Sequence, residues 1–326
     1  TPHSAKPGIT NALWNGGTMT GDIDNLFMDN GFKNAYLNAG GRNNVGIPVS
    51  DIHDWNNVTI MDFRSSAGDS AILRLKGNTD GSYLPPKWWE KYKAIGGESA
   101  GGPYNNGVHS WGEFSKIVDL KKPDGKTAAL MSADNGTTIY YLPPDWWEKF
   151  KSFGGAPTIG CPVSDVRKWE GGEVVDLKMK DGSAAAMMST DGGKTVYYLH
   201  KELWAKYKAL GGPAALGYPK SDWHAWSTSV PKVRIMDFPG KSGYTCAIMK
   251  EDSSSNYYLV KGTLWKAYTG TAGNGASSYL GHPTGEEYKW KDGWLWWAKE
   301  YYRQNFKGGW CWARPRSKGS CGSSSC

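Results

Sequence analysis

The sequence has no apolar run long enough to cross a membrane and no block of like charge. A membrane-spanning helix needs about 20 mostly apolar residues, and the most apolar stretch, Trp294–Trp297, is closely followed by Lys299 and Glu300. The 38 Lys and Arg residues outnumber the 31 Asp and Glu residues, but they are scattered along the chain. We therefore expect no membrane insertion and no nucleic-acid partner.

Signature motifs of several enzyme classes are also absent. The chain contains no Gly-x-Ser-x-Gly elbow, no His-Glu-x-x-His motif, no phosphate-binding loop and no dinucleotide fingerprint. Esterase, metalloprotease, kinase and dehydrogenase activities are therefore without support. No His/Cys spacing specifies zinc, and we expect neither a metal ion nor a cofactor.

Cysteine is sparse, with 5 residues in 326 and no CxxC pair. This number favours disulfides over zinc ligands and leaves one thiol unpaired; Cys321 and Cys326 lie in a Ser/Gly-rich tail that a disulfide can staple. The chain begins at Thr1, which predicts that an N-terminal segment has been removed. Together with glycosylation sequons at Asn57 and Asn135, this predicts a secreted, extracellular glycoprotein.

Trp, Tyr and Gly are abundant, with 18, 18 and 43 residues, which favours short strands and turns and predicts a mainly β protein with short helices. The chain also repeats itself about every 57 residues. Each copy begins with an x-Gly-x-Pro turn. The five turns are Val45-Gly-Ile-Pro48, Ala100-Gly-Gly-Pro103, Ile159-Gly-Cys-Pro162, Leu216-Gly-Tyr-Pro219 and Leu280-Gly-His-Pro283.

A Trp follows each turn at a nearly constant offset. It lies at the same distance from the Pro in four copies and one residue later in the second. These residues are Trp55, Trp111, Trp169, Trp226 and Trp290. Because each repeat must bury a face against its neighbours, we interpret most of these Trp side chains as core residues.

Helices and buried strands are expected after each Trp. In the segment Leu142–Gly155, Pro occupies the first turn and Gly ends the helix. Trp146, Phe150 and Phe153 form one apolar stripe that must pack inward, as do Trp88, Tyr92 and Ile95. Short Ala-containing strands precede the helices at Ala71–Leu73, Ala129–Met131, Ala186–Met188 and Ala247–Met249.

The two ends of the chain suggest how the repeats are arranged. The fifth copy stops after Trp312, and residues 25–41 resemble its missing helix and terminating glycines. A fifth unit completed from both ends would close a propeller-like, pseudo-fivefold ring without open sheet edges. We expect a single domain over 1–314 and a tail over 315–326, with repeats at about 40–95, 96–153, 154–210 and 211–270, and a fifth of 271–314 plus 8–39.

The last copy resembles the LGFP tandem-repeat family. The resemblance is carried by Tyr279-Leu-Gly-His-Pro-Thr-Gly-Glu-Glu-Tyr288 and by Tyr302-Arg-Gln-Asn-Phe-Lys-Gly-Gly-Trp-Cys-Trp312. It implies a pseudo-fivefold domain that is associated with bacterial cell walls and holds wall polysaccharide. A Gly-Ala-His element typical of the family is replaced here by Gly136-Thr-Thr138 and Gly193-Lys-Thr195. The chain also contains no recognisable partner hydrolase or transferase domain.

Candidate ligand-binding residues fall into two groups. Trp111 in the shifted copy and Trp223 and Trp294, which lie off the repeat pattern, are surface platforms on which a sugar ring can stack. The second group shares one offset after the turn Pro and would form a polar collar at one end of a closed ring. Its members are His53, His109, Arg167, His224 and Tyr288.

Carboxylates that break the repeat are the candidates for catalysis. A glycosidase needs two carboxyl groups, one of them kept protonated by its surroundings. The candidates are Glu113, Glu286, Glu287, Asp22 and Asp24. By contrast, the recurring Asp62, Asp119, Asp176 and Asp237 suit turn capping.

Three functions fit these observations. The first is a secreted, monomeric binder of bacterial cell-wall or capsular polysaccharide, in which repeated weak sites combine through avidity. The second is a muramidase-like glycoside hydrolase with an acidic site where the repeat fails. The third is an extracellular scaffold for protein interactions.

Overall fold

The computed structural model describes residues 29–105, 107–240, 245–270, 275–292, 299–314 and 320–323. The chain divides into two compact units. One comprises residues up to Arg167 with Val175–Ser183, and the other comprises Lys168–Val174 with the residues from Ala184 onward. In the described parts no helix is long and apolar enough to span a membrane.

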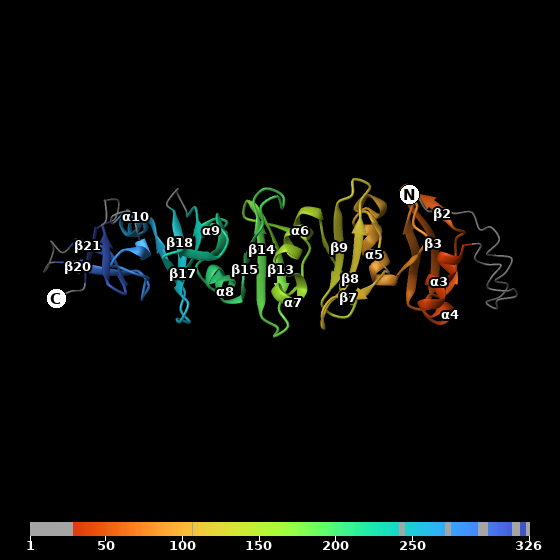
Figure 1. Cartoon of the computed structure of the whole chain (residues 1–326), viewed down its shortest axis with the longest axis horizontal. Helices are drawn as coiled ribbons and strands as arrows, with labels where there is room; N and C mark the ends of the chain where they lie inside the picture. The colour runs from red at the N-terminus through yellow and green to blue at the C-terminus, as the bar shows by residue number, and fades with distance from the viewer. Residues whose placement is uncertain are drawn as a thin grey trace. The chain divides into compact units, whose positions relative to one another are not determined.

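The described strands form antiparallel sheets, one for each of the five sequence copies, so the prediction of a mainly β protein with short helices is confirmed (Figure 1). The first sheet has the order β1-β3-β4-β5, with β2 beside β3. Its strands are β1 Ile47–Pro48, β2 His53–Trp55, β3 Val58–Ser65, β4 Gly68–Leu75 and β5 Ser82–Leu84. The second sheet repeats this order. Its strands are β6 Gly102–Pro103, β7 His109–Ser110, β8 Lys116–Lys121, β9 Thr127–Ser132 and β10 Tyr140–Leu142.

The remaining three sheets follow the same plan. The third consists of β11 Cys161–Pro162, β12 Arg167–Trp169, β13 Gly172–Lys178, β14 Ala184–Ser189 and β15 Tyr197–Leu199. The fourth consists of β16 His224–Ser227, β17 Val230–Phe238, β18 Cys246–Glu251 and β19 Tyr258–Lys261. The fifth consists of β20 Tyr288–Asp292, β21 Lys299–Phe306, β22 Gly309–Ala313 and β23 Ser320–Ser323. The fourth strand of the fifth sheet therefore comes from the C-terminal segment.

Each of the five longer helices in the described residues precedes a second, shorter helix. The longer helices are α3 Asn30–Asn38, α5 Pro86–Ala94, α6 Pro144–Ser152, α8 Lys201–Ala209 and α10 Gly262–Gly270. The shorter ones are α4 Gly41–Asn44, the 3-10 helix η2 Gly97–Ala100, α7 Gly155–Ile159, α9 Gly212–Leu216 and the 3-10 helix η4 Gly275–Ser277. The Gly-Gly step was expected only to end a helix, whereas its second Gly begins a new helical turn.

The expectation of one apolar stripe on each longer helix is too simple. Trp88 and Tyr92 of α5 are buried as predicted, but the neighbouring Trp89 is buried as well. The core around α5 contains Leu73 from the first sheet and Leu130 from the second. The helix lies between two sheets, and both sides of it are therefore apolar.

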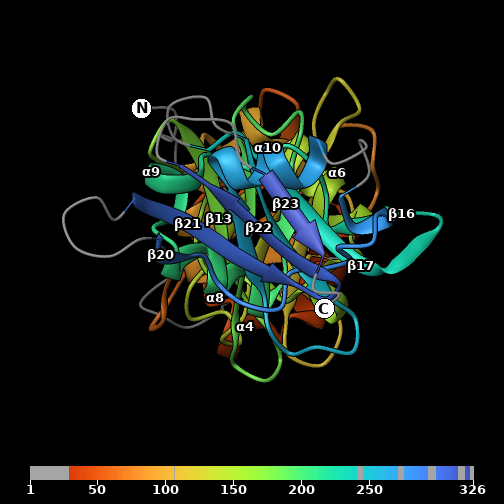
Figure 2. The same cartoon turned by 90° about the vertical axis from the view of Figure 1, so that its left-hand side faces the viewer.

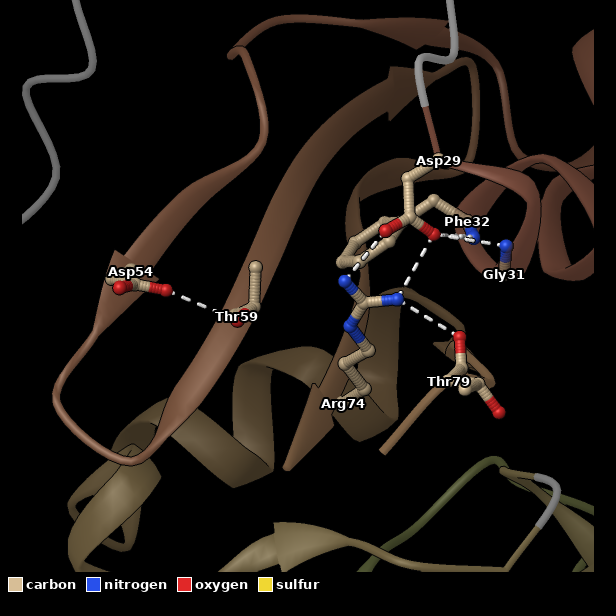
Figure 3. Close-up of polar contacts among 7 residues, drawn as sticks. All are labelled: Asp29, Gly31, Phe32, Asp54, Thr59, Arg74 and Thr79. Carbon is tan, nitrogen blue, oxygen red and sulfur yellow. Dashed lines mark hydrogen bonds and ion pairs between the residues drawn. The ribbon is translucent and has the colours of Figure 1, made fainter. Parts of the chain in front are cut away.

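The first sheet has its own covering helix, α3, within residues that were expected to be helical. Asp29 caps α3, accepting hydrogen bonds from the backbone N–H groups of Gly31 (2.9 Å) and Phe32 (3.3 Å). Arg74 of β4 donates to both oxygens of Asp29, at 2.9 and 2.6 Å (Figure 3). The Arg74 guanidinium also lies 5.0 Å from the centre of the Phe32 ring. Together these contacts hold α3 on the sheet.

The cysteines depart from the expectation of one unpaired thiol. Cys161 and Cys246 are both free and buried, and burial raises their pKa values to about 12 and about 11. Cys311 is disulfide-bonded, and the residue directly opposite it on β23 is Cys321. Cys326 lies outside the described residues.

Candidate functional site

The repeat Trp residues lie where a sheet meets the helix that follows it. Trp111 contacts Trp147 and Phe150 edge-on, with ring centres 5.2 and 5.6 Å apart. Trp55, Trp169 and Trp226 make equivalent contacts in their own copies. The one-residue shift in the second copy therefore leaves Trp111 in the common packing position, where two helix rings occupy its surface.

Each of these indoles also lies against the first Gly of a short helix. A Cβ atom built on Gly155 would come within 2.3 Å of the Trp111 ring, and one on Gly97 within 2.0 Å of Trp55. Gly212 and Gly275 have the same relation to Trp169 and Trp226. Only glycine gives the indole room here, which explains the second Gly of the Gly-Gly step.

Three collar residues pair with carboxylates of the adjacent strand. His53 Nε2 lies 3.9 Å from Asp62, His109 Nε2 lies 3.4 Å from Asp119, and Arg167 Nε lies 2.7 Å from Asp176. The Nδ1 atom of each His donates to a backbone carbonyl two residues earlier. The expected capping role falls on the turn serines instead. Ser50, Ser164 and Ser221 accept hydrogen bonds from the backbone N–H groups of Asp62, Asp176 and Asp237.

The other two collar residues are more open. His224 is exposed, and its Nδ1 donates to the Asp222 carbonyl at 2.7 Å. Tyr288 is 40 % exposed and lies directly opposite Arg303 on β21. Of the five collar residues, Tyr288 is the one that belongs to the aromatic surface of the fifth sheet described below.

Trp223 lies in a separate aromatic cluster of the fourth copy. Its ring centre is 5.5 Å from that of His200 and 5.7 Å from that of Tyr257. Burial lowers the pKa of His200, although its Nδ1 lies 3.1 Å from Glu202. Because all three rings are partly buried against the core, this cluster offers less open surface than a platform needs.

The candidate carboxylates differ strongly in environment. The Glu113 side chain is 78 % exposed and pairs with Lys180, which lowers its pKa. Burial raises the pKa of Glu287, although Lys261 lies 3.6 Å away. Its neighbour Glu286 is ion-paired with Lys206. Asp22, Asp24 and Trp294 lie outside the described residues.

The fifth sheet has two chemically different faces, because side chains alternate along a strand. On one face, Phe306 and Cys311 pack against residues of α10. Figure 2 shows the ribbons of α10 and of strands β20 to β23. The opposite face, which we call the aromatic face, is formed by residues that the strand register places side by side. These are Tyr288 and Trp290 of β20, Tyr301, Arg303 and Asn305 of β21, and Trp310 and Trp312 of β22.

Arg303 lies at the centre of the aromatic face. Its guanidinium carbon is 4.8 Å from the centre of the Trp310 ring and 5.9 Å from that of Trp290, within the range of cation–π attraction. Trp290 is 36 % exposed. Arg303 Nε is buried, and no hydrogen-bond acceptor among the described residues reaches it.

The aromatic face replaces an aliphatic one. Aligning Asp62-Phe63 with Asn305-Phe306 places Arg303 at the position of Ile60, and their cross-strand partners are Trp312 and Leu73. Likewise, Trp310 stands where the first copy has Ala71. In the first sheet these positions receive α5. This segment carries the family resemblance, but Arg303, Trp310 and Trp312 were not predicted as site residues. The Trp-Cys-Trp alternation after Gly308-Gly309 was the available signal.

Other surface features hold none of the strong candidates. A hollow of about 280 Å³ lies at residues 77–82 with Pro103 and Tyr104. The sequon residue Asn135 is exposed in a turn, whereas the side-chain nitrogen of Asn57 is buried. In the described part of the chain, no group of three or more His, Cys, Asp or Glu side chains is placed to hold a metal ion.

Comparisons with known proteins give no assignment of family. No family model and no curated protein matches the chain. Among solved structures it is similar to a Trypanosoma rangeli sialidase, with 13 % identity, a TM-score of 0.14, and coverage of 81 % of this chain but 37 % of the sialidase. A Bacteroides ovatus protein described as xyloglucan PUL GH43B matches with 9 % identity, a TM-score of 0.14, and coverage of 85 % and 51 %. Likeness at this level carries no argument about fold or function.

Proposed function

We propose that the protein binds bacterial cell-wall or capsular polysaccharide and that the aromatic face is its binding surface. The observation that carries this proposal is the exposed Tyr288 and Trp290 beside Arg303, which stands at a position where the other copies bury an aliphatic side chain. An indole face covers the apolar face of a pyranose, while neighbouring polar groups bind its hydroxyls. The polar groups available here are Asn305 and Arg303.

The same proposal includes the setting of the protein. We propose that it is a secreted, extracellular monomer and a member of the LGFP tandem-repeat family. The five x-Gly-x-Pro turns and the motif from Tyr279 to Trp312 support this membership. The collar residues His53, His109, Arg167 and His224 are proposed as secondary contacts, weaker because three of them already pair with carboxylates.

As an alternative to an open aromatic face, we propose the closed five-repeat ring, with the fifth copy completed by the N-terminal segment. Two residues support this proposal, because each lacks the partner that its equivalent has in the other copies. Trp290 is exposed, whereas the equivalent Trp of the other copies lies on a Gly. Gly41 is the equivalent Gly after α3, and a Cβ atom built on it would meet only the Tyr36 ring, at 3.5 Å. Closure would set Trp290 against Gly41 and would compete with the glycan for the aromatic face.

Small-angle X-ray scattering tests closure directly. A compact chain of this length has a radius of gyration of about 20 Å, and a closed ring is expected to give this value. A clearly larger value in monomeric solution would contradict closure and would leave the aromatic face available for ligand. Quenching of Trp fluorescence by iodide, compared between the wild type and Trp290→Phe, gives the exposure of Trp290 independently.

A glycoside hydrolase is the second candidate, and the environment of Glu287 favours it. General acid catalysis at a glycosidic bond needs a carboxyl group with a raised pKa near a second, ionised carboxylate. Burial raises the pKa of Glu287, and Glu286 beside it is ion-paired. In this alternative, Glu287→Gln abolishes the release of reducing ends from cell walls, whereas Glu113→Gln leaves it unchanged.

Purified bacterial sacculi separate the three functions. The protein is incubated with sacculi, and both its sedimentation and the release of soluble reducing ends are measured. We expect sedimentation without release, and a loss of sedimentation of at least tenfold in Trp290→Ala. Tyr279→Ala is the control, since Tyr279 is an exposed aromatic residue of the same copy that precedes β20. Release at catalytic protein concentrations would establish the hydrolase, and neither sedimentation nor release would favour the protein scaffold.

A further inference from the structure

We infer that the aromatic face recognises an acidic sugar, with the sugar carboxylate bound to Arg303. This inference rests on the proposed function, because it names the class of glycan that the same face would select. It is carried by a juxtaposition on the fifth sheet: a guanidinium with a buried, unpartnered Nε lies between the indoles of Trp290 and Trp310.

Arg303 brings a positive charge to the aromatic face. A guanidinium stays protonated in proteins and has five N–H donors. The other described arginines on strands show how this charge is normally satisfied. Arg64 pairs with Asp69, Arg74 with Asp29, Arg167 with Asp176, and Arg234 with Asp252. In contrast, the buried Nε of Arg303 has no hydrogen-bond acceptor among the described residues. A buried donor without an acceptor is unfavourable, and an anionic ligand would remove that cost.

The acidic residues of β20 and β21 are Asp292 and Glu300. Glu300 lies on the opposite side of β21, within 4 Å of Lys289 and Lys291. Asp292 ends β20 and lies in register with Lys299, two residues beyond the Trp290–Tyr301 pair. Arg314 stacks on Tyr301 at 5.4 Å and donates to its hydroxyl at 3.2 Å. The face therefore carries a net positive charge around Arg303.

The planar guanidinium of Arg303 favours a planar anionic group in the ligand. A carboxylate is planar and accepts two parallel hydrogen bonds in the plane of a guanidinium. With indoles on both sides, a planar anion fits beside Arg303, and the attached pyranose ring can rest on the exposed Trp290 or Tyr288. A tetrahedral phosphate would direct oxygens out of this plane toward the rings. The geometry favours a uronic-acid or lactyl carboxylate over a phosphodiester.

The test compares two polymers that share a backbone and differ in charge, together with a phosphate polymer of different backbone. Isothermal titration calorimetry measures binding of the full chain to oligogalacturonate, to its methyl ester and to a ribitol-phosphate polymer. The variants are Arg303→Gln, Arg303→Lys and Trp290→Ala. Arg234→Gln is the matched control, because Arg234 lies on the corresponding strand of the fourth sheet and already pairs with Asp252. Thermal unfolding confirms that each variant is folded.

We expect the wild type to bind oligogalacturonate at least tenfold more tightly than the ester. Arg303→Gln should lose this preference while keeping its affinity for the ester. Arg303→Lys should recover only part of the preference, because an ammonium group cannot form the two parallel hydrogen bonds. Trp290→Ala should weaken both ligands, and Arg234→Gln should change neither.

Three results would overturn the inference. They are equal binding of acid and ester by the wild type, an unchanged preference in Arg303→Gln, and tighter binding of the phosphate polymer than of oligogalacturonate. With any of these, sedimentation with sacculi that still depends on Trp290 would leave the proposed function intact. A protein that binds none of the polymers and no sacculi would refute both.

Discussion

The first and fifth sheets share one strand plan but differ in what covers them. The first sheet is covered on one face by α3, through Phe32 and Tyr36, and on the other by α5. The fifth sheet is packed against α10 on one face, and its other face carries the exposed Tyr288 and Trp290. The comparison shows that a few substitutions on alternate strand positions distinguish a surface that receives a helix from one that carries exposed aromatic rings.

The substitutions act through size and charge. Ala71 is small enough for α5 to lie close to β4, whereas Trp310 at the same position fills that space. Ile60 supplies an apolar contact, whereas Arg303 supplies a charge that a covering helix would have to satisfy. The same set of positions therefore supports either helix packing or an open aromatic surface.

The largest expected effect is on the packed face of the fifth sheet. Phe306 is buried, and its ring stacks on that of Tyr268 at 4.6 Å. Phe306→Ala should reduce the free energy of unfolding by about 3–5 kcal/mol, whereas Asn305→Ala, on the exposed face, should change it by less than about 0.5 kcal/mol. Urea denaturation measures both. Equal losses would show that the two faces are packed alike.

The next effect tests the Trp–Gly contact in the second copy. Gly155 has a positive φ of 62°, and an added Cβ would lie 2.3 Å from Trp111. Gly155→Ala should therefore destabilise the protein by about 2–4 kcal/mol, more than backbone strain alone, which costs about 1 kcal/mol. Gly125→Ala is the control, since φ is 83° there and no atom lies within 4 Å. If Gly125→Ala lowers the free energy of unfolding as much as Gly155→Ala does, the contact with Trp111 does not explain the loss.

A smaller effect is expected where α3 joins the first sheet. Burial raises the pKa of Asp29, but hydrogen bonds from Arg74 and from the N–H groups of Phe32 and Gly31 more than offset this and lower it. Arg74→Ala should cost about 2 kcal/mol at pH 7. A lowered carboxyl pKa stabilises the fold above the ordinary pKa, and this contribution is lost as the pH falls. The difference from wild type should therefore shrink below about pH 4.

Hydrogen exchange at the Phe32 and Tyr36 amides measures the local stability of the contact between α3 and the first sheet. Faster exchange in Arg74→Ala is expected there, with exchange in the fifth sheet unchanged. Acceleration in both regions would mean that the substitution unfolds the protein globally.

The smallest effect concerns Glu287, which directly precedes β20 and pairs with Lys261. Burial raises its pKa, so its ionised form is unfavourable in the folded state. The resulting stability is present below the ordinary carboxyl pKa and is lost as the pH rises through the raised value. Glu287→Gln should therefore raise the unfolding free energy by about 1 kcal/mol or less at pH 7 and leave it unchanged near pH 3. Thermal unfolding across this range measures it, and a variant less stable at pH 7 would show that the Lys261 pair outweighs burial.

Much of the fold follows from the sequence because the repeat makes its signals redundant. The Ala-containing strands at Ala71 and Ala247 and the helix that begins at Pro144 are confirmed. The burial of Trp89 and Trp147 was missed, because a single stripe is expected of a helix that packs against one surface. Which two surfaces enclose a helix depends on the order of the sheets in space, and local periodicity carries no record of that order.

The site was less predictable than the fold. Tyr288 was identified from its offset after the turn Pro, but Arg303 and Trp310 lie on other strands and meet Tyr288 and Trp290 only through the register. Collar residues looked equivalent in sequence, yet Arg167 is engaged by Asp176 while Tyr288 is open. Chemical availability depends on cross-strand neighbours, which a linear pattern does not supply.

The shared helices also bear on how such a chain can lengthen by duplication. α5 is built into the core of the sheets on both sides of it, so a segment copied from one x-Gly-x-Pro turn to the next brings a sheet and the helix that follows it. A copy inserted between two existing copies therefore has complete interfaces between its sheet and the helices on both faces, and no compensating substitution is needed. Among the described residues, the fifth sheet receives no such following helix, and its outer strand positions are free from this packing requirement. Substitutions at those positions can therefore change the surface of the fifth sheet without disturbing the packing of the other copies.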